Sequence, residues 1–379
     1  MTLSSRANLM ILGTLFAITA FDTLLLSFAT PGLISSYGYS RTEAGILGTS
    51  LMVGVGTGSV ILGSISDRIG RKPVIYTSVL LFSVSMGLMS LSQKIEFLAV
   101  LLFLSGVGLG GSLTMTITTL PEVIDRPIEK YMCYLESFWG VGALMIVVTF
   151  NIVPENSLKG LFLAGMLPAA LLPVFRMLPD VKSEKTEISG NIRTLFTDYR
   201  SLTAVIWLIW FCGIYTYYGV FLWLPDVWIS SNFGSLINLL IPVYGIQIIS
   251  PLLLSVLSDE TNTEKLLFSY AVFAGFSVLF FTKVSDPAFR FLSILLASFF
   301  SIGTWVLLIL VTQKTYPQSI RGLGVGTSAG IGRIGGIVAP SVTGFLMDRT
   351  GGFTIPFMIF AVLFYLQSGL ALYVRKLRS

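Results

Sequence analysis

Two ionisable side chains lie inside long apolar stretches of this sequence. Asp22 is near the middle of the first stretch, and Arg333 is about halfway along a stretch close to the end of the chain. A charged side chain costs roughly 2.5 to 3.5 kcal/mol at the centre of a membrane-spanning helix, so such residues are functional candidates. The planar guanidinium of Arg333 suits a carboxylate, and the carboxyl group of Asp22 can take up and release a proton. The alternative is a structural ion pair between the two side chains.

A proton carrier in this chain has to be a carboxyl group, because the sequence contains no histidine. Burial favours the neutral form of a carboxyl group, whereas water or an approaching arginine favours the charged form. Asp22 therefore has the properties of a proton carrier. Glu136, at the cytoplasmic end of the fifth apolar stretch, is a second candidate. The alternative role for Glu136 is that of an interfacial acid that stabilises the start of a helix.

The composition places most of the chain in a lipid bilayer. Hydrophobic residues make up 54% of the 379 residues and charged residues only 11%, whereas ordinary soluble domains carry about 25% charged residues. The net charge of +5 comes from basic residues scattered between apolar stretches, which argues against a nucleic-acid partner. Cys133 and Cys212 lie in separate stretches, so their spacing indicates neither a disulfide nor a metal site. We expect no metal and no cofactor.

Charged and turn-forming residues divide the chain into twelve apolar spans that can cross a membrane. The spans cover residues 8–34, 42–65, 73–92, 96–123, 130–152, 158–178, 200–226, 234–257, 265–284, 288–313, 321–346 and 354–374. An even number of spans puts both termini on one side, and the excess of Lys and Arg on that side predicts that it is the cytoplasm. We predict an N-terminal bundle over residues 1–178, a cytoplasmic linker over 179–199 and a C-terminal bundle over 200–379.

The two halves of the chain repeat the same short motifs. The pair Ser-Asp follows the second span at 66–67 and the eighth span at 258–259. Leu-Pro-Glu at 120–122 follows the fourth span, and Tyr-Pro-Gln at 316–318 follows the tenth. These repeats predict an all-α membrane protein with two pseudo-symmetric six-helix bundles. In transporters built from such repeats the substrate binds where the repeats meet, near the middle of the membrane.

The turn between the second and third spans carries charges of both signs, as does the end of the fourth span. Opposite charges at loop ends can hold two bundles in one conformation, so we predict a cytoplasmic gate here. Within it, a glycine can let helices approach or permit a tight turn. The predicted gate comprises Gly63, Asp67, Arg68, Gly70, Arg71, Glu122 and Arg126. The alternative is that the basic residues only keep this loop in the cytoplasm.

Residues 63–73, GSISDRIGRKP, resemble the loop motif between spans two and three of the major facilitator superfamily. Further similarity covers nearly the whole chain, with GVGLGG at 106–111, ESFWG at 136–140, YYGVFLWLP at 217–225 and GRIGG at 332–336. The second half is similar to the metabolite:proton symporters of that superfamily, including the aromatic-acid and sugar-like branches. The resemblance implies twelve membrane-spanning helices, alternating access, proton symport and a monomer.

Aromatic and amide side chains within the spans are candidates for the wall of a substrate pocket. They are Tyr215, Tyr218, Gln247 and Trp305. Trp223 and Trp228 lie near the end of the seventh span, where tryptophan often marks the membrane surface, and we predict that they belong to this aromatic belt. The glycines of 106–111 lack the Lys-Ser/Thr ending of a nucleotide-binding loop. They indicate close helix packing and argue against an ATP-driven pump.

These observations predict a secondary active transporter of the cell membrane that moves a small organic solute, specifically a carboxylate or related metabolite, together with protons. A proton-coupled efflux antiporter of drugs or metabolites is the first alternative, although the fifth span lacks the Gly-Pro-Gly pattern typical of that group. A non-transporting membrane sensor is the second, although no polar segment is long enough for a soluble signalling domain. No intramembrane catalytic motif is visible, so we expect no enzyme activity.

Overall fold

The structure is a computed structural model that describes residues 4–124, 128–153, 157–179, 193–231, 236–257 and 263–378. Within these ranges the secondary structure consists of helices, without any strand. Twelve of the helical spans are long and apolar enough to cross a membrane. The prediction of an all-α membrane protein with twelve spans is therefore confirmed.

The first half of the chain contains five long spans and one broken span. The long ones are α1 (Ser5–Tyr37), α2 (Arg41–Ile69), α3 (Arg71–Leu88) with its extension η1 (Met89–Leu91), α4 (Ile95–Val123) and α5 (Ile128–Ile152). The broken span consists of α6 (Leu158–Ala164), η2 (Leu167–Leu171) and α7 (Leu172–Phe175). Its two proline residues, Pro168 and Pro173, lack the backbone N–H that a continuous helix would use, which explains the interruption.

The second half begins with the short helix α8 (Arg193–Phe196) and continues with six long helices. These are α9 (Arg200–Ser230), α10 (Leu236–Leu257), α11 (Thr263–Lys283), α12 (Pro287–Thr315), α13 (Arg321–Thr350) and α14 (Thr354–Arg378). Side-chain caps fix where some of the long helices begin. Ser40 and Glu43 form a reciprocal capping box at the start of α2, and the Asp286 carboxylate accepts the N–H groups of Ala288 and Phe289 at the start of α12.

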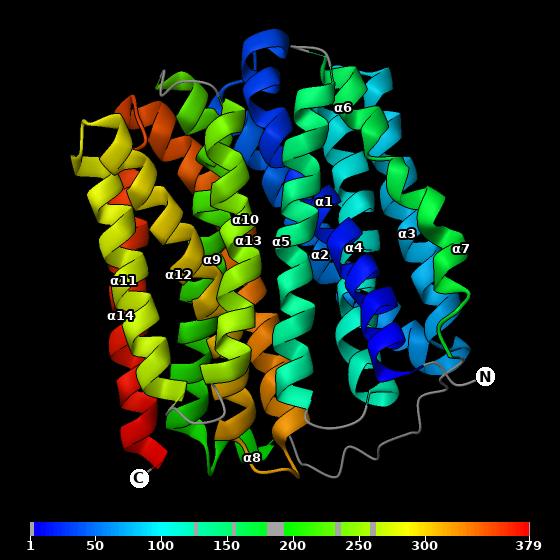
Figure 1. Ribbon diagram of the computed structural model, residues 1–379, viewed down its shortest axis with the longest axis vertical. Helices are drawn as coiled ribbons and strands as arrows, with labels where there is room; N and C mark the ends of the chain where they lie inside the picture. The colour runs from blue at the N-terminus through cyan, green and yellow to red at the C-terminus, as the bar shows by residue number, and fades with distance from the viewer. Residues whose placement is uncertain are drawn as a thin grey trace.

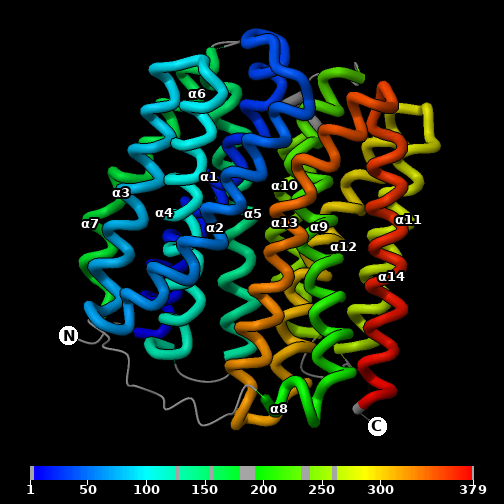
Figure 2. The backbone as a smooth tube through the Cα atoms, turned by 180° about the vertical axis from the view of Figure 1, so that it is seen from behind, coloured from blue at the N-terminus to red at the C-terminus, as the bar shows by residue number. Residues whose placement is uncertain are grey.

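The helices of the two halves lie side by side, with the first half blue to green and the second half green to red (Figures 1 and 2). The helices of the two halves meet mainly in three pairs, α2 with α13, α5 with α10, and α1 with α9, and α5 also touches α12. Both ends of the chain lie at the same end of the molecule (Figure 1). We call this the termini end and the opposite one the far end.

Glycines allow very close helix contacts inside the first half. A Cβ atom added to Gly54 of α2 would lie 2.1 Å from the carbonyl oxygen of Phe103 in α4, and one added to Gly110 would lie 2.1 Å from that of Val55. Real Cβ atoms do not come this close to backbone, so only glycine fits at these positions. The predicted packing role of the glycines in the fourth span is thereby confirmed.

An ion pair joins the two halves at the far end. The Nε group of Arg41, at the start of α2, donates a hydrogen bond of 2.8 Å to Oδ2 of Asp226, near the end of α9. Asp348, near the end of α13, accepts the backbone N–H groups of Arg41 and Thr42. These contacts tie the first residues of α2 to two helices of the second half.

Hydroxyl groups form further contacts between the two halves, away from the Arg41–Asp226 ion pair. The side chains of Thr49 on α2 and Ser341 on α13 lie 2.6 Å apart, oxygen to oxygen. On the neighbouring pair of helices, the hydroxyl of Ser27 donates to the carbonyl oxygens of Phe221 and Leu222. The two halves are thus closed against each other on the far side.

Cross-linking these hydroxyl positions should lock the far end. In a Thr49→Cys/Ser341→Cys variant on a background without Cys133 and Cys212, we expect an oxidant to form a disulfide, because the native oxygens lie within 2.6 Å. If the far end opens during transport, oxidation should abolish solute uptake and a reductant should restore it. The single-cysteine variants are the controls. Full uptake by protein that is demonstrably cross-linked would contradict an opening at this position.

Candidate functional site

A cavity lies between the two halves. Helices α1, α2, α4 and α5 of the first half and α9, α12 and α13 of the second half supply its wall. Most of the wall is apolar, and its aromatic members are Phe16, Trp139, Trp210, Tyr217, Tyr218 and Trp305. Concave, mainly apolar sites with a few polar groups are typical of small-molecule binding.

The cavity extends from the middle of the molecule toward the termini end. Its wall reaches Gln313 on α12, which ends at Thr315, and Val325 on α13, which begins at Arg321. On α5 it reaches Met132, close to the first residue of that helix. Because the far end is closed, the structure represents a conformation in which the cavity lies on the side of the termini.

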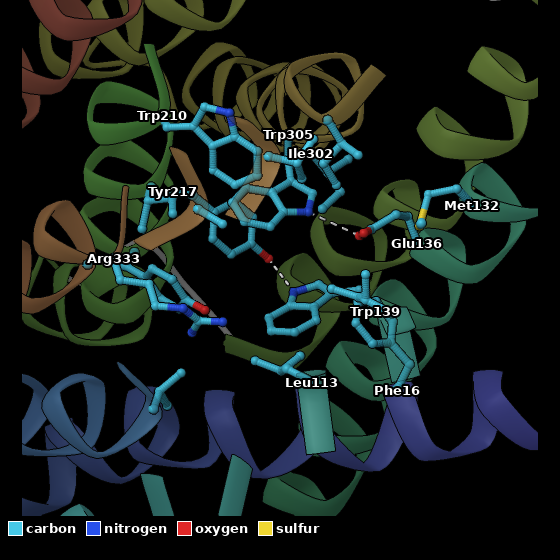
Figure 3. Close-up of a pocket in the computed structure, with 18 of the residues that line it drawn as sticks. Phe16, Leu113, Met132, Glu136, Trp139, Trp210, Tyr217, Ile302, Trp305 and Arg333 are labelled. Atoms are coloured by element: carbon cyan, nitrogen blue, oxygen red, sulfur yellow. Dashed lines mark hydrogen bonds between the residues drawn. The ribbon is translucent and has the colours of Figure 1, made fainter. Parts of the chain in front are cut away.

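Two tryptophans make hydrogen bonds across the boundary within the cavity (Figure 3). The indole N–H of Trp305 on α12 donates to Oε2 of Glu136 on α5 over 3.1 Å. The indole N–H of Trp139 on α5 donates to the hydroxyl of Tyr217 on α9. Both bonds connect one half to the other, so both depend on how the halves are placed relative to each other.

A second layer of polar side chains holds Tyr217 in place. Its hydroxyl donates to Oε1 of Gln247 over 3.1 Å, and Nε2 of Gln247 donates to the hydroxyl of Ser298 over 2.9 Å. Gln247 is completely buried and does not line the cavity. The prediction that Gln247 forms part of the pocket wall is therefore wrong for this conformation, and its contact with the wall passes through Tyr217.

The side chain of Arg333 reaches the cavity from α13 (Figure 3). Two glycines near Arg333 in the helix, Gly332 and Gly335, let α13 lie close to α9. A Cβ atom added to Gly335 would lie 2.5 Å from the carbonyl oxygen of Phe211, and one added to Gly332 would lie 2.8 Å from the side chain of Ile214. Among the described residues, no hydrogen-bond or ion-pair partner of Arg333 is found. The guanidinium is therefore available to a bound anion.

Glu136 faces the cavity from the opposite half. Its side chain is 1% exposed, and Oε1, the oxygen not bound to Trp305, has no hydrogen-bond partner within the described ranges. Figure 3 shows Arg333 on one side of the cavity and Glu136 on the other, with aromatic rings between them. Tyr218, which also lines the cavity, interacts electrostatically with both. The site therefore combines an unpaired cation with a partly unsatisfied carboxyl group.

Asp22 lies away from this cavity. It is completely buried, its carboxyl oxygens have no hydrogen-bond partner in the part of the chain that the structure describes, and it is not part of the cavity wall. Thr19, almost one turn earlier on α1, contacts the hydroxyl of Ser112 on α4, which places Asp22 on the side of α1 near α4. The expectation that Asp22 and Arg333 form a pair or share one cavity is therefore wrong for this conformation. In a span that is apolar all round, the sequence does not reveal which face a residue occupies.

Three aromatic predictions also differ from the structure. Tyr215 packs against Phe360 of α14, with ring centroids 6.0 Å apart, and does not line the cavity. Trp223 and Trp228 are 0% and 1% exposed, so they are core residues and not part of a surface belt. By contrast, Tyr218 and Trp305 do line the cavity, as their selection as pocket candidates implies.

Four aromatic residues of the wall were not among the residues predicted from the sequence: Phe16, Trp139, Trp210 and Tyr217. Helical spacing could have suggested three of them. Trp139 follows Glu136 by about one turn, and residues one turn apart share a helix face. Trp210 and Tyr217 are about two turns apart and share a face for the same reason.

The charged residues at the termini end of the first half form a compact cluster. Nη2 of Arg71 lies 2.7 Å from Oε1 of Glu122, and Nη1 lies 3.6 Å from the Asp67 carboxylate. Arg71 also donates to the hydroxyl of Ser66. These residues belong to α2, α3 and α4, so the described ion pairs of the predicted gate join helices within one half and do not reach across the boundary.

The remaining members of the predicted gate have different surroundings. Gly70 has φ of 94°, a conformation that favours glycine and forms the tight turn between α2 and α3. A Cβ atom added to Gly63 would meet Thr114 at 3.4 Å, an ordinary contact, so close approach does not require glycine there. Arg68 is exposed, and Arg126 lies outside the described residues.

Twelve helices that can span a membrane, packed in two halves with a cavity between them, are the architecture of a solute carrier of the membrane. The chain belongs to the Major Facilitator Superfamily, whose family model matches residues 10–317. It is a multi-pass membrane transporter and not an enzyme.

Individual relatives match nearly the whole chain. The putative niacin/nicotinamide transporter NiaP of Bacillus subtilis is 29% identical over 95% of this chain and 93% of its own. The gentisate transporter of Corynebacterium glutamicum is 24% identical over 97% of this chain and 87% of its own. Among solved structures, a D-xylose-proton symporter matches with a TM-score of 0.78 and 15% identity, covering 97% of both chains.

Removing the partner of Arg71 should destabilise the first half. Arg71 is 7% exposed, and Glu122→Gln would leave its guanidinium without the main counter-charge, so we expect a loss of roughly 1.5 to 3 kcal/mol. Thermal unfolding of the purified protein in detergent measures this loss. Arg68→Gln, at an exposed arginine, is the matched control and should have little effect. Equal melting temperatures for the two variants would contradict a structural role of the Arg71–Glu122 pair.

Proposed function

We propose that this chain is a proton symporter of small aromatic carboxylates that works by alternating access. The observation that carries this proposal is the guanidinium of Arg333, which faces an aromatic cavity and has no ion-pair partner among the described residues. A charge at membrane depth is unfavourable without a partner. A substrate carboxylate can provide one through two parallel hydrogen bonds to the guanidinium.

The remaining wall suits a flat ring. Trp210 and Trp305 pack edge to face with ring centroids 5.7 Å apart, and Trp139 and Tyr217 do so at 6.3 Å. Such rings contact a bound aromatic molecule edge to face or offset, which contributes about 0.5 to 1.5 kcal/mol per pair beyond simple burial. A planar acid of one ring would therefore place its carboxylate at Arg333 and its ring among these residues.

The relatives' names support an acid of this class. Niacin and gentisate, the compounds that appear in two of them, are single-ring aromatic compounds with one carboxylate. The D-xylose-proton symporter is similar in fold alone, so its name supports neither a sugar substrate nor a coupling ion here.

Replacing Arg333 tests the anion site. Arg333→Lys keeps the charge but loses the planar pair of donors, so we expect the apparent affinity for benzoate and nicotinate to fall about tenfold or more. Arg333→Leu should abolish uptake. The measurement is uptake of the labelled acids into proteoliposomes with an imposed pH gradient, and Arg321→Lys, at an exposed arginine of the same helix, is the control. Unchanged uptake by both Arg333 variants would exclude the proposed carboxylate contact.

We assign proton coupling to Asp22, with Glu136 as the second candidate. Among the described residues, neither oxygen of Asp22 has a hydrogen-bond partner. A buried carboxyl group without partners is tolerated only with its proton bound. Release of that proton requires contact with water or with an opposite charge. In this proposal the conformation that opens the far end provides such contact, although Asp22 itself does not touch the substrate.

Asp22→Asn should separate substrate movement from proton movement. The amide resembles the protonated carboxyl group but cannot release a proton, so we expect accumulation driven by a pH gradient to be lost while substrate exchange partly persists. Paired measurements of gradient-driven uptake and counterflow in proteoliposomes distinguish the two. Asp198→Asn, at an exposed aspartate, is the matched control. Asp22 is not the carrier if its amide variant still concentrates the acid.

We further propose that the protein is a monomer in the cytoplasmic membrane with both termini in the cytoplasm, because Lys and Arg gather in the loops of the termini end. The Asp67, Arg71 and Glu122 cluster would then act as a gate on that side by holding α2, α3 and α4 together as one unit.

The proposed orientation can be tested by labelling. A thiol reagent that does not cross membranes should label Gln93→Cys, at the far end, in intact cells and should not label Thr197→Cys. The opposite labelling pattern would reverse the orientation.

A further inference from the structure

We propose that Glu136 is the second polar contact of the substrate site and that it selects aromatic acids whose ring carries a hydrogen-bond donor such as a hydroxyl group. The inference rests on the proposed function, which supplies the carboxylate contact at Arg333. It adds a specific requirement for the other edge of the substrate ring.

The first argument is the unequal use of the two Glu136 oxygens. Oε2 accepts the indole N–H of Trp305 over 3.1 Å, which fixes the orientation of the carboxyl group. Oε1 is buried and has no partner among the described residues, and Glu136 lines the cavity together with Trp139 and Trp305. When Glu136 is ionised, Oε1 is a buried acceptor without a donor, which is unfavourable, so a ligand that brings an O–H group to this position gains affinity.

The second argument is that, among the described residues of the cavity wall, Glu136 provides the buried side-chain oxygen that has no hydrogen-bond partner. The hydroxyl of Tyr217 accepts from Trp139 and donates to Gln247. Gln313 lies near the end of α12 at the termini end and is partly exposed, so water can satisfy it. Oε1 of Glu136 is therefore the buried acceptor of the described cavity wall that remains available to a substrate.

The third argument is the arrangement of the charges. Arg333 and Glu136 reach the cavity from opposite halves with aromatic side chains between them (Figure 3). Tyr218, which also lines the cavity, lies within electrostatic range of both charged groups. A ring whose carboxylate binds Arg333 can thus direct its other edge toward Glu136, and a substrate held in this way connects the two halves.

The specificity that follows can be measured with four simple acids. Benzoate has no further ring substituent, whereas 3- and 4-hydroxybenzoate carry a hydroxyl group that can donate a hydrogen bond. In 3-methoxybenzoate the methoxy group takes the place of the 3-hydroxyl group and can only accept a hydrogen bond. We expect the wild-type protein to bind at least one hydroxybenzoate about tenfold more tightly than benzoate and 3-methoxybenzoate. Binding to the purified transporter can be followed by calorimetry or by quenching of its tryptophan fluorescence.

The Glu136→Leu variant should lose this preference. We expect the affinities of this variant for the hydroxybenzoates to fall to the affinity that the same variant has for benzoate, because the Leu side chain offers no acceptor to a ring hydroxyl. Glu136→Gln retains an acceptor oxygen and should retain part of the preference. This conservative variant, together with a monodisperse elution profile, separates a lost contact from a lost fold.

Two results would overturn the inference while leaving the proposed function intact. One is a wild-type protein that binds hydroxybenzoates and 3-methoxybenzoate equally well, and the other is a preference for hydroxybenzoates that persists in Glu136→Leu. Failure of the proposed function has a different signature. In that case none of the four acids binds to the wild type, or Arg333→Leu binds benzoate as tightly as the wild type does.

Discussion

Arg333 holds a guanidinium group at membrane depth without a carboxylate partner among the described residues. Such a charge is unfavourable in an apolar interior, so its surroundings have to supply water, polar groups or a ligand. The cavity between the halves does this on the side of the termini, and its aromatic wall limits what kind of ligand fits. A structural ion pair with Asp22 would have removed the need for a ligand, but Asp22 lies on another face of the first half and contributes no charge to the cavity.

The packing of the helices explains how this group is positioned. Gly332 and Gly335 let α13 lie directly against α9 on both sides of Arg333 in the sequence, while the Arg41–Asp226 pair closes the far end. Glu136 and Trp139 come from α5 in the other half and bond to Trp305 and Tyr217. The polar contacts of the site are therefore also contacts between the halves, so a change in what the cavity holds can change how the halves are placed.

Much of the fold could be predicted from the sequence because membrane-spanning segments are recognisable by their length and by their lack of charged residues. The identity of Arg333 as a candidate followed from the same rule. The direction in which individual side chains point could not be predicted, since Tyr215, Tyr217 and Tyr218 are equally compatible with a pocket when all faces of the helix are apolar. Only the tertiary arrangement shows that Tyr217 and Tyr218 line the cavity and that Tyr215 packs on Phe360. Trp223 and Trp228 were misjudged because burial between helices was not visible from their position near a span end.

A structure of the transporter with bound 3- or 4-hydroxybenzoate is the most direct test of how the site works. The carboxylate should lie within bidentate hydrogen-bonding distance of the Arg333 guanidinium, with the ring among Trp139, Trp210 and Trp305 and the hydroxyl group on Oε1 of Glu136. A ligand that binds in the cavity with its carboxylate away from Arg333, or an Arg333 side chain that turns to an acidic residue of the protein when the ligand is bound, would contradict this mechanism.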